Sequence, residues 1–210
     1  MDKIMDKIKV LIADDHAIVR MGLVALIDSE DGLEVVGEAD GGAAAVRKAL
    51  KLQPDVVVMD LMMPDMSGIE ATQTLREKLP EAKVLVLTTS AVADDLARVI
   101  EAGAKGVVFK SAANTRLLAA IRAVASGKSA VAPEVAEQLA RDPPVQKLTD
   151  RQAEILASVT RGFTNADIAR QLGISPNSVK DHVNAIFTKI GASTRAEAVA
   201  IALRKNLLKI

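Results

Sequence analysis

Short apolar runs alternate with longer amphipathic stretches along residues 1–126. The short runs contain little polar alternation, as is typical of strands buried on both faces of a parallel sheet. They predict strands at Lys9–Ala13, Leu33–Gly37, Asp55–Met59, Lys83–Thr88 and Gly106–Phe109. The longer stretches have a helical period and predict helices at Ala17–Ile27, Gly42–Leu52, Ile69–Leu79, Asp94–Ala102 and Thr115–Ser126. Five strand–helix units in series indicate a doubly wound α/β domain with a five-stranded parallel sheet.

This alternation stops in residues 127–146, which we interpret as a linker between two domains. A Ser-Gly-Lys-Ser break lies at 126–129, and an Arg-Asp-Pro-Pro break lies at 141–144. The residues between them, Pro133–Ala140, could form one short helix. Two consecutive prolines cannot continue a helix, so the boundary is expected at that pair.

The remaining residues, 147–210, show no strand pattern but carry four helix-start signals. Thr149 with Gln152 and Thr194 with Glu197 match a capping box, in which a cap side chain and a polar residue three positions later satisfy each other's backbone N–H groups. The other two signals are Thr164 with Asp167, and Ser175 before Pro176. We therefore expect an all-α domain of four short helices.

Charge is distributed unevenly between these two parts, although the formal net charge of the chain is zero. Residues 147–210 hold 10 Lys and Arg against 5 Asp and Glu. Since the whole chain holds 27 of each kind, the remainder holds 17 against 22. Any contact with nucleic acid is therefore expected in the second domain, although a surplus of this size is mild evidence alone.

The composition favours a cytoplasmic protein without a membrane partner. No apolar run approaches the roughly 20 residues of a membrane helix. The N-terminus reads Met-Asp-Lys-Ile twice, and its charges are not typical of a signal peptide. The chain has no cysteine, which excludes disulfides and thiolate metal sites.

Acidic residues follow two of the predicted strands. Asp14 and Asp15 come directly after the first strand, and Asp60 comes directly after the third. These two strands are neighbours in the common order of a doubly wound sheet, so the three carboxylates should converge outside their carboxyl ends. Three like charges are costly unless a cation joins them, and carboxylate oxygens favour Mg²⁺ over zinc or copper. His16 is expected to start the first helix rather than to join this site.

Two other strand ends complete the pattern, with a hydroxyl at Thr88 and an ammonium group at Lys110. A single Thr or Lys at a strand end would more often be structural, and a single Asp after a strand is as often a helix cap or turn former. The combination at four strand ends instead indicates a phosphoryl-accepting site. There Asp60 would attack phosphorus in line, while the metal and Lys110 offset the charge of the phosphoryl oxygens.

The motifs around these residues resemble those of response-regulator receiver domains, which have a flavodoxin-like fold. They are Ile-Ala-Asp-Asp-His at 12–16, Val-Met-Asp-Leu-Met-Met-Pro-Asp-Met-Ser-Gly at 58–68, Val-Leu-Thr at 86–88, and Gly-Ala-Lys-Gly-Val-Val-Phe-Lys at 103–110. The resemblance implies that a sensor histidine kinase phosphorylates Asp60. It also implies an Mg²⁺ site formed by Asp14, Asp15, Asp60 and the backbone carbonyl of Met62. Thr88 would then swing toward the phosphoryl group, and Lys110 would pair with it.

The chain departs from the receiver pattern near the end of its fifth predicted strand. Many receivers have an aromatic switch residue two or three positions before the lysine, where this chain has Val107 and Val108. The coupled motion of the threonine and the aromatic residue is therefore in doubt here. Many receivers also place a cis proline after the lysine, whereas Ser111 follows it in this chain.

Residues 165–190 have the pattern of a helix, a tight turn and a second helix. Gly173 suits the left-handed turn. In the second helix, the apolar positions Val179, Val183, Ile186, Phe187 and Ile190 fall on one face. The residues near its N-terminus that would face a major groove are Asn177, Ser178, Lys180, Asp181 and Asn184, while His182 would either contact a phosphate or pack locally. Periodicity alone favours an ordinary helical bundle with a solvated face.

Three segments of the second domain resemble LuxR-type DNA-binding domains, at 148–156, 164–169 and 178–183. Together with the receiver pattern, they identify the arrangement of the NarL/FixJ class of response regulators. The resemblance implies that double-stranded promoter DNA is bound after phosphorylation, by a homodimer. The last helix would pair the two subunits through Arg195, Val199 and Ala202.

Two other functions are compatible with the same motifs. The first is an Mg²⁺-dependent phosphotransferase or phosphatase that uses Asp60 as a turnover nucleophile, although the sequence has no insertion long enough for a substrate-binding cap. The second is a receiver that acts only through protein contacts. We expect neither, and no enzymatic activity beyond phosphoryl acceptance and self-dephosphorylation at Asp60.

Overall fold

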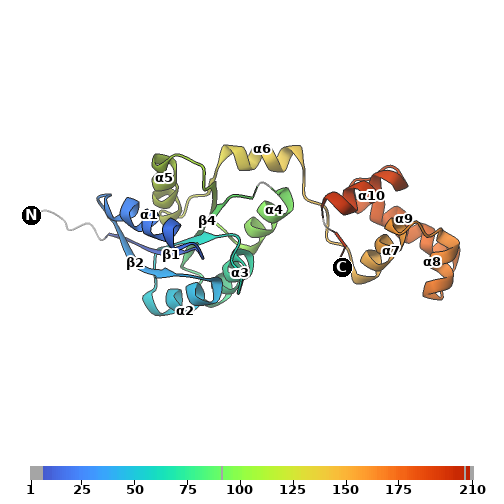
Figure 1. Ribbon diagram of the computed structural model, residues 1–210, viewed down its shortest axis with the longest axis horizontal. Coiled ribbons are helices and arrows are strands. Elements are labelled where there is room, and N and C mark those ends of the chain that lie inside the picture. Colours follow the sequence, from blue (N-terminus) through green and yellow to red (C-terminus); the bar gives the residue numbers. More distant parts are fainter. Residues whose placement is uncertain (1–6, 91, 206, 209–210) are drawn as a thin grey trace, which may run out of the picture. The chain divides into compact units, whose positions relative to one another are not determined.

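The computed structural model describes residues 7–90, 92–205 and 207–208, and it divides the chain into two compact units (Figure 1). The first unit ends at Pro143 and the second begins at Pro144. The strands are β1 (Ile8–Ala13), β2 (Leu33–Ala39), β3 (Val56–Asp60), β4 (Lys83–Thr88), β5 (Gly106–Phe109) and β6 (Ala130–Val131). The helices of the first unit are α1 (Ala17–Asp28), α2 (Gly42–Leu52), α3 (Gly68–Lys78), α4 (Ala93–Ala102), α5 (Asn114–Ala125) and α6 (Pro133–Arg141).

The sheet of the first unit is parallel, with the strand order β2-β1-β3-β4-β5-β6. The prediction of a doubly wound sheet with β1 beside β3 is confirmed. One apolar cluster joins the sheet to α2, α3, α4 and α6, and a second joins its other face to α1 and α5. In Figure 1, α1 and α5 accordingly lie across the sheet from α2 and α3. The continuous apolar runs form strands because both faces of the sheet are covered.

The predicted five-stranded sheet has a sixth strand, β6, in the residues that we interpreted as a linker. Ala130 and Val131 pair in parallel with Gly106 and Val107. A side chain at Gly106 would come within 2.9 Å of the Ala130 carbonyl oxygen, so glycine allows this approach. The following helix, α6, packs through the fully buried Val135. Two residues give no periodic pattern, which explains why the sequence did not reveal β6.

The second unit consists of α7 (Asp150–Thr160), α8 (Asn165–Leu172), α9 (Pro176–Ile190) and α10 (Arg195–Arg204) around one apolar core. The predicted capping box of Thr149 and Gln152 is present, and Thr164 forms a further one with Asp167. Thr194 caps α10, but the Glu197 carboxylate accepts its bond from the Ser193 N–H at 2.7 Å. The capping box predicted at Thr194 is therefore incomplete, because the Glu197 carboxylate binds the N–H of Ser193 and not that of Thr194.

Among the described residues, no helix is both long enough and apolar enough to span a membrane.

Candidate functional site

Three carboxylates meet at the carboxyl ends of β1 and β3. Asp60 is the last residue of β3, and Asp14 and Asp15 follow the last residue of β1, which pairs in register with Met59. Ligand atoms of Asp14, Asp15, His16 and Asp60 all lie within 4.8 Å of one another. Asp14 and Asp60 are buried, at 1% and 4% exposure, whereas the Asp15 side chain is partly exposed. The structure thus brings together the three carboxylates that the strand ends predicted.

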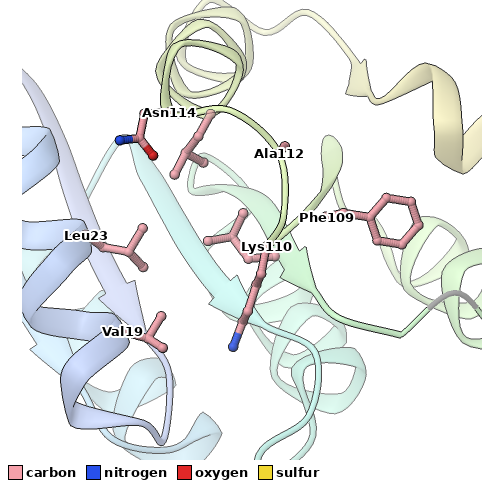
Figure 2. Close-up of a pocket in the computed structure, with 8 residues that line it drawn as sticks. Val19, Leu23, Phe109, Lys110, Ala112 and Asn114 are labelled. Atoms are coloured by element: carbon pink, nitrogen blue, oxygen red, sulfur yellow. The ribbon is translucent and has the colours of Figure 1, made fainter.

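Lys110, directly after β5, joins two of these carboxylates. Its Nζ lies 2.6 Å from Oδ2 of Asp14 and 2.9 Å from Oδ2 of Asp60. Figure 2 shows the Lys110 side chain extending from the end of β5, beside a pocket of about 80 Å³ that Val19 and Leu23 of α1 also line. The ammonium group therefore lies between two buried anions and offsets their repulsion.

Burial and this ion pairing have opposing effects on the pKa values of the site. Burial raises the pKa of Asp60 above its ordinary value and outweighs the lowering effect of Lys110, while the neighbouring Asp14 raises it further. Burial would lower the pKa of Lys110, but its hydrogen bonds to Asp14 and Asp60 outweigh this and raise the pKa. Lys110 is therefore charged at neutral pH, and ionised Asp60 is less favourable here than in water.

The donor set of this site fits Mg²⁺. Oδ1 of Asp15 is shielded from solvent yet accepts no hydrogen bond. The imidazole Nδ1 of His16 lies only 2.8 Å away, but its geometry does not make a hydrogen bond. The backbone N–H of Met62 points to Oδ1 of Asp60 at 3.5 Å, so the loop after β3 runs beside the carboxylates. A hard divalent cation would satisfy these oxygens and reduce their repulsion.

Two residues beside the site were not predicted as part of it. His16 precedes α1 as expected, but its imidazole also lies against Asp15. Arg20 donates from Nη1 to the backbone carbonyl of Asp14 at 2.7 Å and lies 3.6 Å from the Glu38 carboxylate. Arg20 is the only charged residue of α1 before Asp28, and a charge in an apolar helix was the available signal.

The Thr88 side chain lies at the end of β4 and is fully buried. Its hydroxyl oxygen accepts a hydrogen bond from the Ser90 N–H at 2.9 Å. Among the described residues, no hydrogen bond joins this hydroxyl to the carboxylates. Contact with a phosphoryl group on Asp60 would therefore require a movement of the Thr88 side chain or of its loop.

The aromatic residue of β5 stands two positions later than the usual switch position. Val107 is fully buried, and Phe109 is half-buried and packs on the same apolar cluster. Alternate residues of a strand share a face. The aromatic side chain therefore lies further along the same face of β5 as Val107, and in Figure 2 its ring points away from Lys110.

The predicted recognition face lies on α9. Val179, Val183, Ile186 and Ile190 are buried in the core of the second unit, and Gly173 ends α8 in a left-handed conformation. The predicted contact residues Asn177, Lys180, Asp181 and Asn184 are exposed, while Ser178 and His182 are half-buried. The Ser178 backbone N–H donates to the Ser175 hydroxyl that caps the helix.

The predicted subunit contact on α10 needs a correction. Ala202 is fully buried in the core of the second unit, so its side chain does not face a neighbouring subunit. The Arg195 guanidinium donates to the Phe163 carbonyl and approaches Asn165 Oδ1 at 3.4 Å, both at the start of α8. Val199 is partly buried, and Leu203, which the sequence analysis omitted, is 65% exposed. Helical periodicity alone did not identify which face of α10 the core covers.

Both units match known protein families. Residues 10–122 match the response regulator receiver domain, and residues 146–202 match the bacterial regulatory proteins of the luxR family. The chain therefore belongs to the two-component response regulators, in the NarL/FixJ class that joins a receiver to a LuxR-type domain.

Relatives of the same length carry both units. The transcriptional regulatory protein LiaR of Bacillus subtilis is 39% identical over 96% of this chain and 99% of its own length. The response regulator protein VraR of Staphylococcus aureus is 36% identical over 96% and 99%. Among solved structures, response regulator ChrA of a heme-sensing two-component system matches with a TM-score of 0.58 and 36% identity, over 97% of this chain and 100% of that one. A complex of RcsB with DNA matches with a TM-score of 0.68 and 26% identity, over 95% and 98%.

Proposed function

We propose that this chain is a phosphorylation-activated transcriptional regulator that accepts a phosphoryl group on Asp60 from a sensor histidine kinase. The proposal rests on one observation: Asp14, Asp15, Asp60 and Lys110 lie close together at the carboxyl ends of the strands. Asp60 is the central member of this group, because it ends β3 between the carboxylates of β1 and the ammonium group after β5.

In the proposed transfer, an Asp60 carboxylate oxygen attacks phosphorus and forms an acyl phosphate. The bond from phosphorus to the donor breaks, which is a P–N bond for a phosphohistidine and a P–O bond for acetyl phosphate, and the donor leaves with the electron pair. Lys110 is already within 2.9 Å of Asp60 and would offset charge on the phosphoryl oxygens. The reaction then needs no further residue to act as a turnover catalyst, and loss of the group to water returns the free carboxylate.

The metal expected in this reaction is Mg²⁺, held by Asp14, Asp15, Asp60 and the backbone carbonyl of Met62. Bound there, it would offset the negative charge of the carboxylates and the incoming phosphoryl group. Oδ1 of Asp15 supports this assignment, since it is shielded from solvent and accepts no hydrogen bond, although Nδ1 of His16 lies 2.8 Å away. Thr88 is the hydroxyl that would turn toward the phosphoryl oxygens.

We propose that the second unit binds double-stranded promoter DNA through α9 and that phosphorylation favours a homodimer. Asn177, Lys180, Asp181 and Asn184 are exposed on α9, and the relative RcsB has been solved as a complex with DNA. Val199 and Arg195 remain candidates for the subunit contact, together with the exposed Leu203 of α10. A phosphoryl group changes the population of the dimer only through its different affinity for the two states.

Asp60→Asn is expected to abolish phosphoryl incorporation, because an amide is not a nucleophile toward phosphorus. The test is intact-mass spectrometry after incubation of the full chain with Mg²⁺ and acetyl phosphate. The wild-type chain should gain one phosphoryl group, and the Asp55→Asn variant should also gain it, since Asp55 lies at the opposite edge of the sheet. An adduct on Asp60→Asn, or none on the wild type with either acetyl phosphate or a kinase, would refute the assignment.

Lys180→Ala is expected to weaken binding to duplex DNA about tenfold and to reduce its salt dependence by about one counterion, because Lys180 is exposed on the recognition face. Fluorescence anisotropy of a labelled duplex at several salt concentrations measures both quantities. Lys147→Ala is the matched control, since Lys147 is also exposed but precedes α7. Equal losses in both variants would mean that α9 is not the recognition helix.

A further inference from the structure

The loop between β3 and α3, residues 61–67, carries the proposed metal ligand Met62, and it is held at one point by another part of the fold. The Gly42 N–H donates to Oδ1 of Asp65 at 3.0 Å, and the Ala43 N–H donates to Oδ2 at 3.2 Å. Both donors lie in the first turn of α2, more than 20 residues earlier in the chain. A single carboxylate thus ties the loop to the start of α2.

The start of α2 depends on this contact because it has no cap of its own. Its N-cap residue is Gly41, which has no side chain to accept a hydrogen bond, and its first turn contains no acidic residue. The first N–H groups of a helix have no partner within the helix, and a negative charge there is stabilising. Asp65 supplies both the acceptors and the charge from across the loop.

Two glycines allow the loop to approach α2 this closely. A Cβ at Gly41 would lie 2.5 Å from Oδ1 of Asp65, and a Cβ at Gly42 would lie 2.3 Å from the Met66 carbonyl oxygen. Gly41 has extended dihedral angles that any residue adopts, so its backbone does not require glycine. Close packing of the loop is therefore the structural reason for a glycine at this position.

The charge of Asp65 is consistent with this role. Partial desolvation would raise its pKa, but backbone N–H donors of Met66, Ala43, Gly42 and Asp65 itself lower the pKa below its ordinary value. The carboxylate is therefore ionised throughout the neutral pH range, and the contact does not depend on pH there.

The backbone hydrogen bonds that hold the loop lie at its two ends. The Leu61 N–H donates to the Leu87 carbonyl, and the Gly68 N–H donates to the Leu61 carbonyl. Between these ends, the Met62 side chain is 61% exposed, while the Met63 side chain is buried. Met63 and Met66 pack on the apolar cluster, and Asp65 adds hydrogen bonds from the middle of the loop to α2.

We propose that Asp65 is a positioning residue that holds the β3–α3 loop, and with it the Met62 carbonyl, in the place required for Mg²⁺ binding. The inference rests on the proposed metal site. Asp65 itself does not contact the metal or the phosphoryl group. It acts through the loop, as residues that orient metal ligands commonly do.

Asp65→Ala is expected to raise the dissociation constant for Mg²⁺ about tenfold, the lower end of the usual effect of removing such a partner. Asp65→Asn keeps one acceptor oxygen and should give an intermediate value. Isothermal titration calorimetry with MgCl₂ on the full chain measures the constants, and thermal unfolding on the same samples measures stability. At saturating Mg²⁺, Asp65→Ala should be phosphorylated by acetyl phosphate at the wild-type rate.

Two further variants separate positioning from a general loss of stability. Asp55→Ala removes a comparable hydrogen bond, which the Lys9 N–H donates to Oδ2 of Asp55 at 2.8 Å. This bond lies at the amino ends of the strands, away from the site, so the dissociation constant for Mg²⁺ should not change. Gly41→Ala should weaken Mg²⁺ binding in the wild type by displacing Asp65, but it should have little further effect in the Asp65→Ala background.

The outcomes distinguish this inference from the proposed function. A wild-type Mg²⁺ constant in Asp65→Ala would overturn the positioning role and leave the metal site intact, and an equal rise in Asp55→Ala would do the same. No Mg²⁺ binding by the wild-type chain would overturn the metal site itself and the inference that rests on it.

Discussion

Lys110→Met is expected to lower the free energy of unfolding of the first unit by about 3 kcal/mol at pH 7, the typical cost of leaving a buried charge without its partner. Nζ of Lys110 contacts Asp14 at 2.6 Å and Asp60 at 2.9 Å, and both carboxylates are nearly inaccessible to solvent. Methionine is unbranched and keeps most of the length of the side chain, but it removes the charge. Urea-dependent hydrogen exchange of peptides from β1 and β3 reports the stability of this unit separately from the second.

The loss of stability in Lys110→Met should depend on pH in a defined direction. The pKa of Lys110 is raised in the fold, so its stabilising contribution is complete below the unfolded value of 10.5 and disappears only as pH rises through the higher folded value. The pKa of Asp60 is also raised, so protonation of Asp60 becomes favourable in the fold as pH falls toward its ordinary value of 3.8. The difference between wild type and Lys110→Met should therefore be largest near neutral pH and should decrease in acid.

Asp60→Asn provides the control of opposite sign. Because burial makes ionised Asp60 less favourable in the fold than in water and raises its pKa, a neutral amide should raise the free energy of unfolding at pH 7. Added Mg²⁺ should stabilise the wild type by mass action and reduce this difference. Equal stability of wild type and Lys110→Met at pH 7 would show that the ammonium group does not stabilise the buried carboxylates.

Gly68→Ala is expected to destabilise the first unit by about 3 kcal/mol, at the upper end of the usual cost of overpacking. A Cβ at Gly68 would lie 2.2 Å from the Asp60 carbonyl oxygen and 2.9 Å from Cα of Leu61. Both atoms belong to the backbone, so a side-chain rotation cannot relieve the contact. The displaced segment contains the proposed phosphoryl acceptor, and incorporation of the phosphoryl group should therefore decrease as well.

Helix propensity alone predicts the opposite result, because alanine is favoured over glycine by about 1 kcal/mol within a helix. Gly22→Ala is the matched control, since Gly22 lies within α1 and a Cβ there would meet nothing within 4 Å. This control should be stabilised by up to about 1 kcal/mol in urea unfolding. A Gly68→Ala variant as stable as Gly22→Ala would contradict the packing argument.

The sequence predicted the parts of the site that depend on the ends of strands. Asp14, Asp60 and Lys110 converge because each follows a buried apolar run, and parallel strands place their carboxyl ends at one edge of the sheet. Each of these residues is identified by the few residues that precede it, so inspection of short segments is enough to predict them. The alternation of strands and helices predicts a doubly wound sheet, and the common order of such sheets places β1 beside β3, as the structure shows.

The sequence did not predict contacts between distant residues that have no repeating pattern. Asp65 stands in a loop, and only the folded chain shows that it reaches Gly42. Arg20 is separated from its partner Glu38 by most of α1 and most of β2. Ala202 was assigned to a surface because α10 is apolar on more than one side, and only tertiary packing shows which side is covered. Such contacts follow from the arrangement of elements rather than from the elements themselves.

The short strand β6 also affects how the first unit can be produced alone. A fragment that ends at residue 126 would lack β6. The strand β5 would then be the edge strand, and the backbone groups of Gly106 and Val107 that pair with β6 would have no partner. An exposed edge strand can pair with another chain through the same backbone hydrogen bonds, which promotes aggregation. The same fragment would lose Val135 from the apolar cluster around β5. A fragment that extends to Pro143 keeps both protections, so it should remain monodisperse where the shorter one self-associates.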